Sequence, residues 1–243
     1  MEGAVPQDGV TVYEGSALTR ANFAEFLVQA YMGSGDRLGK GLRWSRYLWR
    51  AYLDFNRTLH GFRGCEDKAD RLHSSAAWIE DRIIHLGASP PTAESVFDDW
   101  HLETRRGVED RMGSWGKSQT MRPGQSQKWV NMSLKYIYTA SALGVAEDFA
   151  VAASGYKYAH LPLDKSVLAE LSRKGCDLAG KWIVRWSSLD EAAYDSIQVW
   201  SREYLANGKS LLDLDWSLWN RSGVSNYEDH EAVRGVPIAG RVR

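Results

Sequence analysis

The sequence predicts an all-α fold, because apolar residues recur at helical spacing and no run shows sustained alternation of apolar and polar residues. The chain has 243 residues, of which 44% are hydrophobic, so it can bury one sizeable core or two small interleaved ones. No repeat of fixed period occurs, which favours a globular arrangement over a solenoid. We expect one domain over residues 1–243, in two interleaved helical lobes with a cleft between them.

The N-terminal half is expected to contain an irregular, glycine-containing arm over residues 1–18, followed by four helices. Apolar residues three and four positions apart indicate the second and third helices, Gly33 ends the first, and Gly87 ends the third. Gly107 weakens the second half of the fourth helix. The expected helices span residues 21–32, 42–55, 66–86 and 92–112.

A central buried helix is predicted over residues 129–143, because apolar side chains surround it on all sides. Its polar residues Lys128, Asn131, Lys135 and Thr139 fall at i, i+3, i+7 and i+11, and therefore share one face. Lysines inside a core are costly unless they border a cavity. This face is therefore expected to look into a water-accessible cavity.

Asp164 is expected to lie at the start of the next helix. Pro162 favours an extended segment before it, and residues 165–174 form a helical pattern that ends in basic residues and Gly175. One interpretation is that the Asp164 carboxylate caps the free N–H groups of this helix. The other is that it faces Lys128.

The C-terminal third is expected to hold two more helices and a polar tail. Ser188-Leu189-Asp190-Glu191 is a capping box that opens a helix ending near Gly208. Residues 211–219 form a short aromatic-rich helix or turn, in which Asp213 and Asp215 are interpreted as a cap and a solvated carboxylate. Residues 220–243 are polar and glycine-punctuated, as is typical of a loosely held tail.

The net charge of −1 argues against a protein that coats nucleic acid non-specifically, but the charge is unevenly distributed. Residues 37–53 and 111–146 each carry five lysines or arginines and no acidic residue. If these two windows meet in space, they form a basic surface suited to local contact with DNA. The alternative is that each window is an ordinary solvated face.

Metal, cofactor and membrane binding have little support in the sequence. Cys65 and Cys176 are isolated, and the six histidines include neither an HExxH motif nor a pair four residues apart. No apolar run reaches membrane length, and no leader pattern opens the chain. The expectation is a cytoplasmic monomer that has no cofactor, no metal and no membrane contact.

Residues 121–175 resemble the helix-hairpin-helix DNA glycosylases, the superfamily of 8-oxoguanine glycosylase. Pro123-Gly124-Gln125-Ser126-Gln127-Lys128 is similar to the family hairpin with the lysine of its bifunctional members, and Pro162-Leu163-Asp164 is similar to its aspartate segment. The resemblance covers about a fifth of the chain. Ser126 stands where the family has a second glycine. The spacing from Lys128 to Asp164 exceeds that of the family, which implies an insertion around residues 142–158.

This resemblance implies a DNA glycosylase that extrudes a damaged or modified base and cleaves its N-glycosidic bond. Asp164 would stabilise the positive charge that develops on the sugar. Either the amine of Lys128 attacks the sugar and forms a Schiff base, or water attacks directly. An oxidised purine and a bulky modified base of phage DNA are the two substrate classes, with roles in repair or in defence. Further residues expected to contact DNA are Gly124, Gln125, Ser126, Gln127, Trp129, Asn131, Lys135, Tyr136, His160 and Trp186.

The alternative function is a non-catalytic helical protein that binds nucleic acid or a partner. In that case Lys128 and Lys135 would hold phosphate or acidic groups, and Asp164 would serve only as a helix cap. The pairing of Lys128 with Asp164 favours the enzyme, whereas the missing second glycine favours the binding protein.

Overall fold

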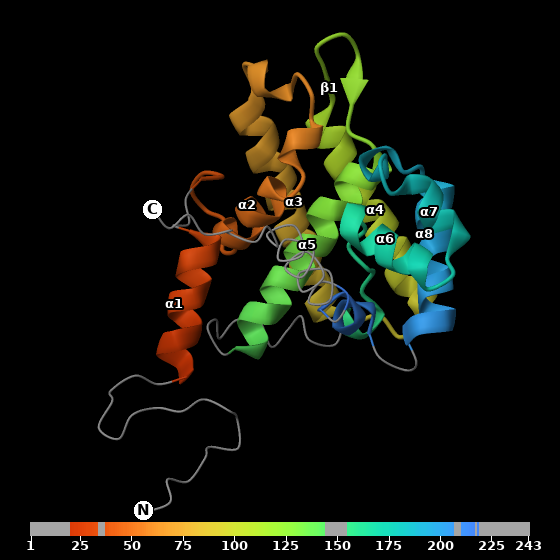
Figure 1. The fold of residues 1–243 in the computed structure, drawn as a ribbon. Helices are drawn as coiled ribbons and strands as arrows, with labels where there is room; N and C mark the ends of the chain where they lie inside the picture. Colours follow the sequence, from red (N-terminus) through yellow and green to blue (C-terminus); the bar gives the residue numbers. More distant parts are fainter. Residues whose placement is uncertain (1–19, 34–36, 144–154, 207–209, 217, 219–243) are drawn as a thin grey trace, which may run out of the picture.

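The computed structural model describes residues 20–33, 37–143, 155–206, 210–216 and 218 (Figure 1). The expected N-terminal arm, most of the expected insertion and the C-terminal tail lie outside the described residues. Within them the predicted all-α class is confirmed. The only sheet there is a two-stranded antiparallel hairpin of β1 (Ser114–Trp115) and β2 (Gln119–Thr120).

The helices agree closely with the spans expected from the sequence. Most ends differ by one to three residues, but α5 begins six residues earlier than expected. The N-cap of α8 is Asp190 and not Ser188, and α8 gives way to a π-helical turn (Arg202–Ala206) before Gly208. One short helix, α7, had no counterpart among the expected elements. The helices are α1 (Arg20–Met32), α2 (Ser45–Leu53), α3 (Lys68–Ala88), α4 (Glu94–Met112), α5 (Pro123–Ala142), α6 (Lys165–Arg173), α7 (Asp177–Trp182) and α8 (Glu191–Ser201). Residues 211–216 are also helical.

The molecule contains two hydrophobic cores, and α5 runs through its middle (Figure 1). The first core gathers the inner faces of α1 to α5. The second gathers α6, α7, α8 and the extended segment of residues 161–163. Trp186, in the short turn η5 (Trp186–Ser188), packs against both cores. This arrangement matches the expected pair of lobes.

The start of α5 differs from the hairpin that the family resemblance implies. Residues 123–127 form the first helical turn instead, with Pro123 in the position where a missing N–H costs nothing. The Gly124 amide donates to the Leu189 carbonyl at 3.1 Å, and a Cβ on Gly124 would lie 2.3 Å from the Trp186 carbonyl oxygen. The face of the first turn of α5 that carries Gly124 is thus packed against η5, so the Gly124 amide is not available to a DNA phosphate.

Gly107 does not interrupt α4, which runs on to Met112. A Cβ at this position would lie 2.3 Å from Nε1 of Trp78 on α3, so the glycine admits the indole against the helix. The indole N–H donates to the Thr104 carbonyl at 3.0 Å. Gly107 therefore sets the close packing of α3 on α4, which outweighs its poor helix propensity.

Candidate active site

A cavity of about 460 Å³ lies between the two lobes, beside α5. One wall comes from α1, α2 and α5, and the other from Asp164 and the helical residues 211–216. Its polar lining holds three carboxylates and three cations. The residues that line it are Tyr31, Arg50, Asp54, Lys128, Met132, Lys135, Tyr136, Asp164, Asp215 and Trp216.

Lys128 and Asp164 meet on the wall of this cavity. The Lys128 ammonium donates to Oδ2 of Asp164 at 2.7 Å, while Oδ1 accepts from the Val167 amide at 2.9 Å. Asp164 therefore caps α6 and faces Lys128 at the same time, so both interpretations of the sequence hold. The Lys128 side chain is 6% exposed and that of Asp164 is 26% exposed, so the carboxylate is the partner that can reach a ligand.

The charges of this pair reinforce each other. Burial by itself raises the pKa of Asp164, but the Lys128 ammonium and the amides of Val167 and Ser166 together bring that pKa below its ordinary value. Burial likewise opposes the charge of Lys128, but Asp164 and Asp215 together raise its pKa above the ordinary value. Both groups are consequently ionised at neutral pH.

Gln127 holds the segment that carries Asp164 in place. Its amide nitrogen donates to the Leu163 carbonyl at 2.8 Å, and its amide oxygen accepts from the Leu163 N–H at 3.2 Å. Gln198 binds Leu161 in the same way: its amide oxygen accepts from the Leu161 N–H at 2.9 Å, and its amide nitrogen donates to the Leu161 carbonyl at 2.8 Å. These two glutamines hold an extended segment that pairs with no strand among the described residues, and Asp164 directly follows it.

A second buried pair occupies the far side of the cavity. The Lys135 ammonium donates to Asp215 and lies 4.1 Å from the centre of the Trp216 ring. The Asp215 side chain is only 3% exposed, so its interpretation as a solvated carboxylate was wrong. Burial raises the pKa of Asp215, although Lys135 and Lys128 oppose this shift. Lys135 is thus neutralised by a counterion that lies 80 positions away in the sequence.

The remaining wall is a chain of polar contacts that the sequence did not indicate. The Tyr136 hydroxyl donates to Asp54 at 2.6 Å, and Arg50 pairs with Asp54 at 3.1 Å. Arg50 also donates to the Tyr31 hydroxyl at 2.9 Å. Burial and the neighbouring Asp54 raise the pKa of Tyr136, so its hydroxyl remains a hydrogen-bond donor. The Asp54 carboxylate itself has its pKa raised by burial.

Two of the expected DNA contacts belong instead to a buried network beside α4 and α8. Asn131 is fully buried and donates to the hydroxyl of Tyr194 at 3.0 Å. His160 contacts the same hydroxyl through Nδ1 at 2.8 Å and Asp98 through Nε2 at 2.7 Å. Burial lowers the pKa of His160 to about 4, so the ring is neutral at pH 7. This network joins the two lobes.

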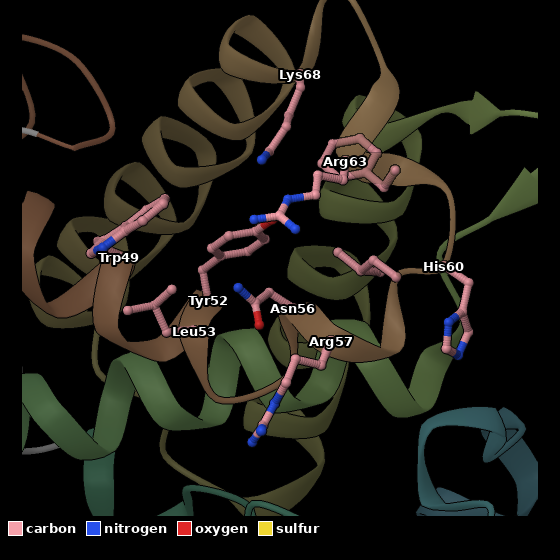
Figure 2. Close-up of a pocket in the computed structure, with 10 residues that line it drawn as sticks. Trp49, Tyr52, Leu53, Asn56, Arg57, His60, Arg63 and Lys68 are labelled. Atoms are coloured by element: carbon pink, nitrogen blue, oxygen red, sulfur yellow. The ribbon is translucent and has the colours of Figure 1, made fainter.

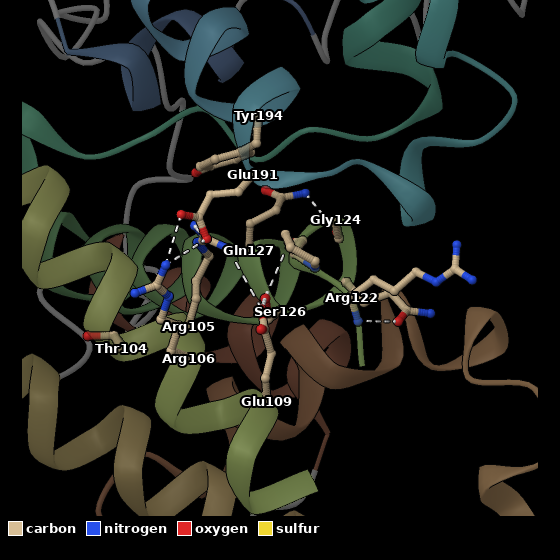
Figure 3. A network of polar contacts seen from close by, with 12 residues as sticks. Thr104, Arg105, Arg106, Glu109, Arg122, Gly124, Ser126, Gln127, Glu191 and Tyr194 are labelled. Carbon is tan, nitrogen blue, oxygen red and sulfur yellow. Dashed lines mark hydrogen bonds and ion pairs between the residues drawn. The ribbon is translucent and has the colours of Figure 1, made fainter. Parts of the chain in front are cut away.

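The start of α5 is also engaged within the protein (Figure 3). Ser126, where the family has a glycine, is fully buried, and its hydroxyl donates to Glu109 on α4. The carboxylate of Glu191 on α8 lies 3.1 Å from Arg106, which completes a polar link between α4 and α8. Gln125 is buried as well, and its side-chain amide binds the Thr58 carbonyl at 3.0 Å. Ser126 and Gln125 are therefore not accessible to DNA.

Neither of the two tryptophans proposed for base stacking lines the cavity. Trp129 is fully buried, donates to the Leu48 carbonyl at 3.0 Å and packs against Tyr52 in the first core. Trp186 lies at the junction of α5 with η5. The aromatic side chains that do line the cavity are Tyr31, Tyr136 and Trp216. Of the ten expected DNA-contacting residues, Lys135 and Tyr136 border the cavity together with the expected pair of Lys128 and Asp164.

Comparisons of the chain with protein-family models, with curated proteins and with solved structures give no match. In the part of the chain that the structure describes, no helix is long and apolar enough to cross a membrane.

Proposed function

We propose that the protein is a DNA glycosylase that removes a damaged or modified base by cleaving its N-glycosidic bond. The observation that carries this proposal is the ionised Lys128–Asp164 pair on the wall of a cavity between two lobes. A carboxylate that is held ionised, and that is partly accessible, suits a reaction in which positive charge develops on a sugar. The same arrangement agrees with the family resemblance of residues 121–175.

The reaction that these charges favour uses water as the nucleophile. The bond between the sugar carbon C1′ and the base nitrogen breaks, and its electron pair leaves with the base, which takes up a proton from solvent. Asp164 stabilises the cationic sugar, and water adds to C1′ with loss of a proton to leave an abasic site. In the resting state Lys128 is protonated, so its amine must first lose a proton before it can form a Schiff base.

The cavity walls supply what an extruded base requires. Its volume of about 460 Å³ falls within the usual range for ligand sites. Trp216 and Met132 offer apolar surface, while the hydroxyl of Tyr136 and the guanidinium of Arg50 offer hydrogen bonds to a base edge or to its substituent. An oxidised purine and a bulky modified cytosine of phage DNA remain the two substrate classes. They correspond to roles in repair and in antiviral defence.

The test is an excision assay on duplexes that carry either oxidised purines or bulky modified cytosines, with borohydride present in parallel samples. We expect base release that leaves an abasic site, without a covalent protein–DNA adduct. An adduct that disappears in Lys128→Ala would instead establish the Schiff-base route. The glycosylase proposal would be contradicted if the protein produced no base release and no adduct with any duplex of the panel.

A non-catalytic DNA-binding protein is the second candidate, and the buried start of α5 favours it. Residues 124–127 make internal hydrogen bonds, so the backbone grip that the family resemblance implies is missing. For this candidate, DNA would bind with no release of any base in the panel, and Asp164→Asn would leave the affinity unchanged.

A further inference from the structure

A second cavity, of about 480 Å³, lies on the other side of α2 (Figure 2). It is formed by the end of α2, the short turns η1 (Asn56–Thr58) and η2 (Phe62–Gly64), and the first residue of α3. The side chains of Arg63 and Lys68 point toward the ring of Tyr52 and the amide of Asn56, whereas Arg57 extends away from this centre (Figure 2). None of these residues was singled out by the sequence.

The polar groups that meet in this cavity are chiefly donors. None of the ten lining residues drawn in Figure 2 carries a carboxylate. Neither Arg63 nor Lys68 forms an ion pair with any described residue. Burial raises the pKa of Tyr52, so its hydroxyl stays protonated. The cavity beside α5 differs sharply, since there every lysine has a carboxylate partner. A site with a guanidinium and an ammonium and no counterion is suited to an anion.

The size and the aromatic wall of the cavity indicate more than a simple ion. A phosphate on Arg63 and Lys68 would fill only part of about 480 Å³. Trp49 is half-buried on the opposite wall, and its ring lies 5.3 Å from that of Tyr52, centre to centre. A flat ring that borders a cationic centre is the combination by which proteins bind single-stranded nucleic acid without reading its sequence.

A shallow hollow connects this cavity with the candidate active site. It shares Trp49 and Leu53 with the second cavity, and Tyr31 and Arg50 with the first. Arg37 adds a further cation to its lining. The three depressions are therefore neighbours around α2 and follow one another from the cavity of Asp164 to that of Lys68.

We propose that the cavity of Arg63 and Lys68 binds a phosphate and its neighbouring nucleotide on the DNA strand whose target base occupies the cavity of Asp164. This inference rests on the proposed function and adds to it a second contact on the same strand. The Arg63 guanidinium and the Lys68 ammonium hold the phosphate, and the adjacent base stacks on Trp49. The site binds independently of the chemistry, because none of its residues touches the bond that breaks.

The experiment compares Arg63→Gln/Lys68→Gln with Lys174→Gln/Lys181→Gln, which removes the same charge from exposed lysines near the second core. Fluorescence anisotropy measures the affinity for an unmodified duplex and an unmodified single strand at several salt concentrations. We expect the first variant to bind about tenfold more weakly and to lose about one unit of the logarithmic salt slope. We expect the control to bind as the wild type does. Equal affinities and slopes in all three proteins would overturn the proposal.

A free nucleotide is the other source of the same chemistry, and deoxyadenosine monophosphate is its probe. We expect this nucleotide to quench tryptophan fluorescence only at much higher concentration than the single strand. If it binds as tightly as the strand, and Arg63→Gln/Lys68→Gln abolishes that binding, the cavity serves a small nucleotide and the strand proposal is wrong. Trp49→Ala should weaken strand binding but keep the salt slope, because stacking releases no counterions.

Failure of this inference can be told apart from failure of the glycosylase proposal. Binding of unmodified DNA requires no base release, so loss of affinity in Arg63→Gln/Lys68→Gln would support the site even if no base were excised. Conversely, excision that depends on Asp164, with affinity unaffected by Arg63 and Lys68, would support the enzyme and reject this site.

Discussion

We expect removal of the Lys128 charge to destabilise the folded protein. Lys128→Met keeps most of the buried stem but removes the charge, which leaves the Asp164 carboxylate with backbone amides as its remaining donors. Removing one partner of a fully buried pair costs about 3–5 kcal/mol. Because the Asp164 side chain is 26% exposed, we expect a smaller loss, about 2–3 kcal/mol at neutral pH.

The stability difference between Lys128→Met and the wild type should depend on pH. In the wild type the pKa of Asp164 is below its ordinary value, so its contribution to stability is present above that ordinary value and is lost as pH falls through the lowered one. In Lys128→Met burial is no longer opposed by the ammonium, so we expect the pKa of Asp164 to rise. The stability difference between variant and wild type should therefore shrink as the pH falls from about 7 to about 4.

Urea unfolding of Lys128→Met, Asp164→Asn and the double variant measures both effects. Adding Asp164→Asn to Lys128→Met should recover part of the loss, because it removes the uncompensated carboxylate and keeps a cap oxygen. Lys174→Met, at an exposed lysine, is the matched control and should change stability little. Equal stability of Lys128→Met and wild type at neutral pH would refute the reasoning.

Three further predictions concern the parts of the fold that hold the cavity. Gly124→Ala should cost about 1–3 kcal/mol in urea unfolding, because its Cβ meets the Trp186 backbone, which cannot rotate away. Gly107→Ala should cost less, because its Cβ meets the half-buried side chain of Trp78, and equal losses would contradict this distinction. Gln127→Leu should lower the free energy of unfolding by about 2–4 kcal/mol, because it leaves the buried N–H and C=O of Leu163 without the hydrogen bonds to Gln127. Unchanged stability would show that Gln127 does not hold this segment in place.

The sequence was sufficient for the helices and for the principal charge pair. Residues 129–143 are apolar except along one narrow face, which predicted a buried central helix, and Lys128 at its head required a polar neighbour. Pro162 placed Asp164 at a helix start, and the structure confirms that it meets Lys128. These features are local in sequence or follow from helical periodicity, and so they can be recognised in one chain.

The other walls of the cavity depend on contacts between distant segments. Asp54 and Asp215 lie 82 and 80 positions from their partners Tyr136 and Lys135, and no local pattern connects them. The unmet charge of Lys135 was a usable signal, since a buried lysine requires a counterion, and the aromatic surroundings of Asp215 suggest burial. Ser126 and Gln127 were misassigned for the same reason, because their partners on α4 and on the segment of residues 161–163 come from elsewhere in the chain.

The most direct test of the account is single-turnover base release by Asp164→Asn on the duplex that the wild type processes. Asn keeps an oxygen for the Val167 amide and removes the charge, so we expect a folded protein that releases base about 100-fold more slowly or not at all. Asp190→Asn is the control, because Asp190 caps α8 through the Ala193 amide in the same way at an exposed position. It should release base at the wild-type rate. Undiminished release by Asp164→Asn would contradict the central claim.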